Sequence, residues 1–124
     1  MASTGETGSL WPLIQNHAAR LRRNGRRRLA GRSLALLLVV FGSLDVVTTQ
    51  AAQAHGFLEG NPVMHFVQLY LGPWWAVPKV AAHILLASVI LWLPTRKLLL
   101  AAVGMVLVYA VIVGHNLLLT GWLA

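Results

Sequence analysis

The stretch that decides the fold is the apolar run SLALLLVVFGSLDVVTTQAAQA, which occupies residues 33–54. A helix rises about 1.5 Å per residue, so a run of this length crosses a hydrocarbon core of about 30 Å. Two more such runs follow, at about residues 74–93 and 98–120. In lipid every backbone polar group needs an internal partner, which helices provide at this chain length. The sequence therefore predicts an all-α membrane protein with three transmembrane helices.

Composition supports a single membrane domain, at residues 33–124. The chain has 124 residues, of which 57% are hydrophobic and only 10% are charged. A soluble domain has about a quarter of its residues charged, so lipid must cover much of this apolar surface. Cysteine is absent, which excludes disulfides, thiolate metal sites and a cysteine nucleophile.

A short helix is expected between the first two spans. Gly56 ends the first helix, and Asn61-Pro62 is a helix start, with Asn as the N-cap and Pro at the first helical position. The helix at residues 62–71 is too short to cross the membrane, and Gly72-Pro73 ends it. We expect it to be interfacial or re-entrant at the outer surface, and the sequence leaves both alternatives open.

Residues 1–32 form a basic tail that precedes the first span. We expect it to be disordered at its start and then an amphipathic helix over residues 11–32, interrupted at Asn24-Gly25. A basic run can also be a nucleic-acid arm, but next to an apolar span it favours lipid headgroups, so no nucleic-acid partner is expected. The predicted headgroup contacts are Arg22, Arg23, Arg26, Arg27, Arg28, Arg96 and Lys97.

The positions of the basic residues predict the orientation. Three crossings place the arginine run and the turn at Arg96-Lys97 on the same side of the membrane. The positive-inside rule makes this side cytoplasmic. We therefore expect a multi-pass protein of a bacterial inner (plasma) membrane, with its N-terminus in the cytoplasm and its C-terminus outside.

Ionisable residues within a span are costly, so each of them is a candidate for function. In the first span, Asp45, Thr48, Thr49 and Ala52 follow the spacing of one helix face. Given the topology, most of the polar residues of the spans fall in the outer half of the membrane, below the outer loop. The predicted polar cluster consists of Asp45, Thr49, Glu59, Asn61, Lys79, His83 and His115.

Two roles are open for the charged members of this cluster. Asp45 and Lys79 can form a structural salt bridge that fixes helix register, although Glu59 is a second possible partner for Lys79. Alternatively, Asp45 titrates near the midplane as a proton or cation site. Glu59 either precedes the short helix as part of a turn or gates an outward-facing cluster.

Metal and enzyme chemistry have weaker support. His83 and His115, with Asp45, are candidate ligands for a divalent metal, but no HxxxH or ExxH spacing accompanies them. The two histidines are also candidate axial haem ligands. The sequence contains no nucleophile elbow, phosphate loop, dinucleotide fingerprint or zinc-protease signature. We therefore assign no catalytic residue and expect no cofactor.

The segments at residues 44–49 (LDVVTT) and 56–62 (GFLEGNP), followed by Lys79, resemble a family of small uncharacterised bacterial and archaeal three-helix membrane proteins. The pattern is Asp…Thr…Glu-x-Asn-Pro…Lys, and the resemblance covers about residues 34–120. The family is a domain of unknown function, so the resemblance implies the architecture and no activity. It draws attention to Asp45, Thr49, Glu59, Asn61, Pro62 and Lys79.

These observations favour a small integral membrane protein of unknown biochemical activity. Its polar cluster packs the helices together and binds an ion or a partner, in a homo-oligomer or a larger membrane complex. One alternative is a subunit of a proton- or cation-coupled transporter or channel. A further alternative is a membrane metal-binding or redox subunit.

Overall fold

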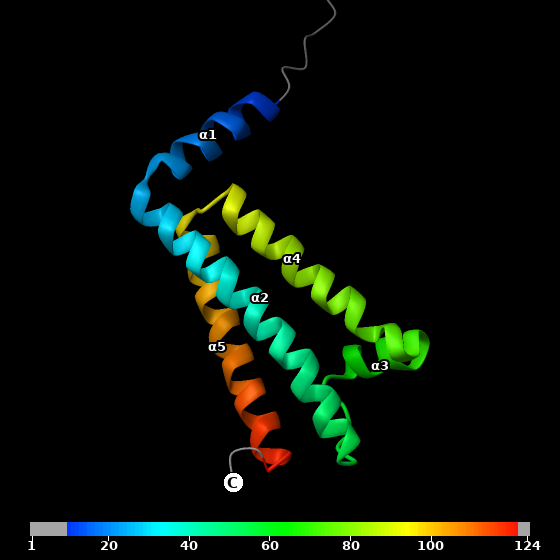
Figure 1. The fold of residues 1–124 in the computed structure, drawn as a ribbon. Helices are drawn as coiled ribbons and strands as arrows, with labels where there is room; N and C mark the ends of the chain where they lie inside the picture. The colour runs from blue at the N-terminus through cyan, green and yellow to red at the C-terminus, as the bar shows by residue number, and fades with distance from the viewer. Residues whose placement is uncertain (1–9, 122–124) are drawn as a thin grey trace, which may run out of the picture.

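A computed structural model describes residues 10–121, and every regular element in this range is a helix (Figure 1). The predicted all-α class is therefore confirmed for the described residues, whereas the expected disorder at the start of the tail lies largely outside them. The elements are α1 (Trp11–Arg23), α2 (Gly25–Ala54), α3 (Pro62–Leu71), the 3-10 helix η1 (Gly72–Trp75), α4 (Ala76–Trp92) and α5 (Arg96–Leu119).

Helix α2 is the centre of the bundle. It packs along both α4 and α5, while α4 and α5 hardly contact each other (Figure 1). The apolar core lies in the half of the bundle nearest the α4–α5 turn, and three of its five buried residues are alanines that allow close helix approach. These core residues are Ala35, Leu38, Ala87, Ile90 and Ala102. Because α4 and α5 each pack against α2 and hardly against each other, a space remains between them.

The first long helix begins earlier than the apolar pattern indicates. Asn24 has an extended backbone, and its side chain accepts a hydrogen bond from the Arg27 amide at 3.2 Å, which caps α2 at Gly25. The expected interruption at Asn24-Gly25 is thus present. However, the expected span start at about Ser33 lies within a continuous helix, since α2 includes the arginines that precede it.

Helix α1 turns away from α2 and reaches the end of α4 (Figure 1). The rings of Trp11 and Trp92 stack there, with centroids 5.9 Å apart and planes inclined by 22°. Aromatic stacking of this kind contributes about 0.5–1.5 kcal/mol beyond the area buried. The helical part of the basic tail therefore lies at the same end of the bundle as the α4–α5 turn.

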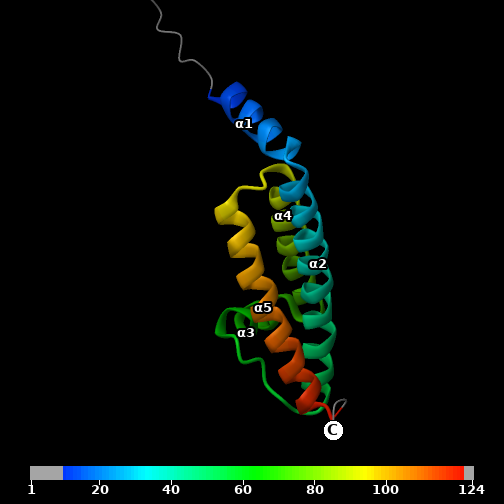
Figure 2. The ribbon, with the colours of Figure 1, turned by 90° about the vertical axis from the view of Figure 1, so that its left-hand side faces the viewer.

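The second long apolar segment, Pro62–Trp92, is broken near its start. Asn61 caps α3 by accepting a hydrogen bond from the Val63 amide at 3.0 Å, and Gly72 ends α3 with a positive φ of 50°. Helix α3 folds back beside the start of α4, and the last turns of α2 and α5 extend past it (Figures 1 and 2).

Three helical segments are long and apolar enough to cross a membrane, namely Gly25–Ala54, Pro62–Trp92 and Arg96–Leu119. The predicted number of spans therefore matches the described structure. The loop between α2 and α3 lies at the opposite end of the bundle from the α4–α5 turn, as alternating crossings require (Figure 2).

Candidate functional site

An ion pair joins α2 to α4 in the interior of the bundle. The Lys79 Nζ lies 2.8 Å from the Asp45 Oδ2, and the two side chains are only 10% and 4% exposed. The sequence left open whether Lys79 pairs with Asp45 or with Glu59, and in the structure it pairs with Asp45. A buried pair of this kind costs desolvation energy, so its value lies in fixing one arrangement of the helices.

Hydrogen bonds extend this ion pair to α5. The Thr49 hydroxyl donates to the Asp45 Oδ1 at 3.2 Å, which leaves neither carboxylate oxygen without a partner. The Asn116 Nδ2 then donates to the hydroxyls of Thr48 and Thr49, both at 3.3 Å. Since Asp45, Thr48 and Thr49 share one face of α2, a single polar network connects three helices.

Lys79 is held from a second side by an aromatic ring. Its Nζ lies 5.3 Å from the centroid of the Trp75 ring, and Trp75 is itself buried. A desolvated cation over an aromatic face is favourable by up to about 2 kcal/mol. The ammonium group of Lys79 is therefore committed to Asp45 and Trp75.

His83 lies one turn beyond Lys79 on α4. Its Nδ1 lies 2.6 Å from the Lys79 carbonyl oxygen, and because a carbonyl only accepts, the proton must be on Nδ1. In the neutral imidazole this leaves the Nε2 as an acceptor, and the Nε2 has no hydrogen-bond partner among the residues that the structure describes. The His83 side chain is 5% exposed.

The position of the His83 ring depends on a glycine in α2. A Cβ atom added at Gly42 would lie 2.6 Å from both the Cγ and the Nε2 of His83, so only glycine permits this close packing. On its other side the ring packs against Tyr109 of α5, with centroids 4.8 Å apart and planes inclined by 58°. His83 therefore fills the junction of three helices.

Glu59 belongs to a separate set of contacts at the loop end of the bundle. Its Oε1 accepts from the Asn61 amide at 2.9 Å, and its Oε2 accepts from the Gln68 Nε2 at 3.5 Å. The Gln68 Oε1 in turn accepts from the Gln53 Nε2 at 2.9 Å. These bonds tie the loop and α3 to the end of α2. They give Glu59 no cationic partner among the described residues.

A cleft of about 980 Å³ opens between α4 and α5, with α2 as its floor and the loop and α3 at one end. All members of the predicted polar cluster line this cleft, from the ion pair on the floor to Glu59 at the loop end. The members are Asp45, Thr49, Glu59, Asn61, Lys79, His83 and His115. Most of the remaining lining is apolar, including Met105, Val108 and Ile112 of α5. The geometry suits a ligand with a long apolar part and a small polar part.

Sequence reasoning missed several residues of this site. The sequence pattern singles out neither Trp75, at the start of an apolar run, nor Tyr109, among the apolar residues of α5. Gln68 carried no signal, because a glutamine in a short helix is ordinary. Its role follows from the way α3 folds back against the end of α2.

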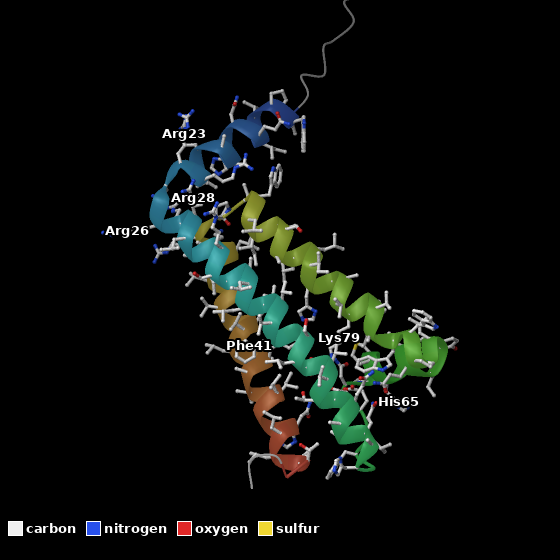
Figure 3. The ribbon with its side chains drawn as sticks, in the orientation of Figure 1. Arg23, Arg26, Arg28, Phe41, His65 and Lys79 are labelled. Carbon is white, nitrogen blue, oxygen red and sulfur yellow. The ribbon has the colours of Figure 1, made fainter. Side chains whose placement is uncertain are left out.

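The predicted headgroup residues lie at the opposite end of the bundle from Glu59. Figure 3 shows Arg23, Arg26 and Arg28 beside α1 and the start of α2, and Lys79 far from them along the bundle. The members of this set are exposed apart from Arg27, which is half-buried. Charge is thus strongly separated between the two ends of the bundle.

The structure does not assemble the candidate metal ligands. Within residues 10–121 no group of three or more histidine, cysteine, aspartate or glutamate side chains is close enough to hold a metal ion. His115 is exposed on the wall of the cleft, and Asp45 is occupied by Lys79. The geometry of the described residues therefore gives no support to a metal centre built from His83, His115 and Asp45.

No curated protein and no solved structure matches this chain. A family match covers residues 36–122, which include α3, α4 and α5 whole, most of α2, and every residue of the predicted polar cluster. The chain belongs to the family described as "Domain of unknown function (DUF5658)".

Proposed function

We propose that this chain is a multi-pass integral membrane protein whose basic end faces the cytoplasm. Charge separation along the bundle supports this orientation, since the arginines of α1 and α2 lie at the same end as Arg96 and Lys97. Basic residues that flank short loops are retained on the cytoplasmic side of a bacterial inner membrane. There they contact anionic lipid headgroups.

The polar network has a structural role in this proposal. Helices α4 and α5 hardly contact each other, so their relative position depends on the contacts that each of them makes with α2. The ion pair of Asp45 with Lys79 attaches α4, and the hydrogen bonds of Asn116 attach α5. The network thereby holds the two helices apart at a fixed spacing.

The cleft that results binds a small membrane-soluble molecule with a polar end. The single observation that carries this function is the cleft itself, at about 980 Å³, because ligand sites occupy about 300–1,000 Å³. It lies between two helices that make few mutual contacts, so a molecule can enter it sideways from the lipid. No reaction is assigned to the site.

Two glycines of α5 provide a matched test. A Cβ added at Gly104 or at Gly114 meets nothing within 4 Å, but only Gly104 lines the cleft. The protein is reconstituted in phosphatidylcholine nanodiscs with a long-chain alcohol that carries a photoreactive diazirine in its tail. Adducts are then located by mass spectrometry.

We expect adducts on cleft residues such as Met105 and Val108 in the unsubstituted protein. Gly104→Leu should reduce them at least five-fold, because its side chain fills the cleft, while Gly114→Leu should leave them unchanged. Adducts spread evenly over the lipid-facing surface, or equal yields in the two variants, would show that the cleft is not a binding site.

A proton- or cation-coupled transporter subunit is the second candidate. The observation that favours it is Asp45, a carboxylate within a spanning helix that lines a cleft. Proton and divalent-ion flux into liposomes that contain the protein tests it. Flux that Asp45→Asn abolishes would support transport, and no flux above that of empty liposomes would exclude it.

A further inference from the structure

We propose that the molecule held in the cleft is a hydrophobic cation, an amphiphile with a protonated amine, and that Glu59 supplies its counter-charge. This inference rests on the proposed function and adds the chemical class of the ligand. Three features of the cleft carry it, namely its charge, its hydrogen-bonding groups and its length.

The charge of the cleft is negative. Asp45 and Glu59 are its two acidic residues, and among lysines and arginines only Lys79 lines it, beside the histidines His83 and His115. Lys79 neutralises Asp45, with 2.8 Å between the charged groups. Glu59 has no ion pair within the described residues, and the other nine lysines and arginines lie in the segments 20–32 and 96–97, away from it. A cationic ligand therefore supplies the counter-charge for Glu59 at this end of the bundle.

The same distribution disfavours anionic and phosphate-bearing ligands. Such a headgroup is bound most strongly by an ammonium or guanidinium donor. Lys79 is the one ammonium group among the residues that line the cleft, which include no arginine, and it is already held by Asp45 and Trp75. A phosphate at the loop end would meet the carboxylate of Glu59 with no compensating charge.

The carboxylate of Glu59 also has more acceptor sites than it has hydrogen bonds. Each oxygen of Glu59 accepts one hydrogen bond, from the Asn61 amide or from Gln68, and a carboxylate has about four acceptor sites. An ammonium group carries donors only, so it suits the remaining acceptor sites of Glu59.

The length of the cleft suits a hydrocarbon tail. Its lining on α5 extends from Ala101 to Leu119, which corresponds to about 27 Å of helix. One leaflet of the hydrocarbon core is about 15 Å thick, so a tail whose head lies at Glu59 fits within the cleft.

The experiment compares three competitors with the same alkyl chain and different heads. A long-chain primary amine, the corresponding alcohol and the corresponding alkyl sulfate each compete with the diazirine alcohol in the nanodiscs described above. The variant is Glu59→Gln, which removes the charge and keeps an acceptor for the Asn61 amide. The matched control is Glu6→Gln, which removes one negative charge from the tail.

We expect the amine to compete at least ten-fold better than the alcohol, and the sulfate to compete worst. Glu59→Gln should remove the advantage of the amine and leave the alcohol unchanged, whereas Glu6→Gln should change neither. Partitioning into the bilayer is the same for all variants, so differences between variants report on the site.

Two results would overturn the inference and leave the proposed function in place. One is equal competition by amine and sulfate, and the other is an amine advantage that survives Glu59→Gln. Failure of the diazirine alcohol to label the cleft, with no difference between Gly104→Leu and Gly114→Leu, would instead remove the proposed function itself.

Discussion

The Lys79 Nζ and the Asp45 Oδ2 are 2.8 Å apart in a part of the bundle that is almost fully buried. The Asp45 Oδ1, meanwhile, accepts a hydrogen bond from Thr49, which Asn116 of α5 also contacts. The contact between two oppositely charged side chains is therefore part of a polar network that connects all three long helices.

Removal of either charge of this pair should be more damaging than removal of both. Asp45→Asn or Lys79→Met leaves an uncompensated buried charge, and each should destabilise the protein by about 3–5 kcal/mol. The double variant leaves no buried charge, so its loss of stability should be clearly smaller than the sum of the single losses. Thermal unfolding of the four proteins in mild detergent measures these differences.

The control for this cycle is Glu59→Gln combined with Lys79→Met, because Glu59 does not pair with Lys79 in the structure. That combination should be additive within about 0.5 kcal/mol. Additive behaviour of Asp45→Asn with Lys79→Met would contradict the structural role of the ion pair.

Gly42→Ala should disturb the packing of His83. The new Cβ would lie 2.6 Å from two atoms of the His83 ring, so the ring or the helices must move, at a cost of about 1–3 kcal/mol. Gly31→Ala on the same helix is the control. Its Cβ would be 3.5 Å from its nearest neighbour, which is ordinary contact.

Melting temperatures of the two variants check this prediction. Gly42→Ala should lower the melting temperature, whereas Gly31→Ala should leave it unchanged or raise it, since alanine favours helix by about 1 kcal/mol over glycine. His83→Ala should also relieve most of the loss caused by Gly42→Ala. Equal effects at the two glycines would show that His83 does not pack there.

Asn116→Ala should loosen the attachment of α5. The substitution removes the two donated hydrogen bonds at 3.3 Å to Thr48 and Thr49. Hydrogen bonds between spanning helices are worth about 0.6 kcal/mol on average and at most about 1.7 kcal/mol, so the expected loss lies near 1 kcal/mol.

The neighbouring residue gives the comparison for this substitution. His115 is exposed on the same helix, and His115→Ala should change the melting temperature little. Hydrogen exchange of the α5 amides provides the second measurement, with faster exchange in Asn116→Ala only. Identical exchange rates in the two variants would show that the hydrogen bonds of Asn116 do not attach α5 to α2.

The absence of cysteine makes the orientation directly testable. Leu58, in the loop between α2 and α3, is 88% exposed, and Leu58→Cys should react with a membrane-impermeant maleimide added to intact bacterial spheroplasts. Arg96→Cys, at the α4–α5 turn, should react only after the membrane is permeabilised. The reverse pattern would mean that the protein has the opposite orientation.

Much of the architecture follows from the sequence alone. The apolar runs are long enough to cross a membrane, and the cap at Asn61 determines where α3 begins. The face shared by Asp45, Thr48 and Thr49 follows from helical spacing, and these residues are all buried. Such features depend on neighbours within one helix, so a linear pattern contains them.

Tertiary structure decided everything that depends on contacts between helices. Whether Lys79 pairs with Asp45 or Glu59 is a matter of relative helix position, since both carboxylates are compatible with the sequence spacing. The folding back of α3 gives Glu59 its contact with Gln68 instead. Spacing along the chain sets which residues share a face, but only the packing of one helix on another sets which faces meet.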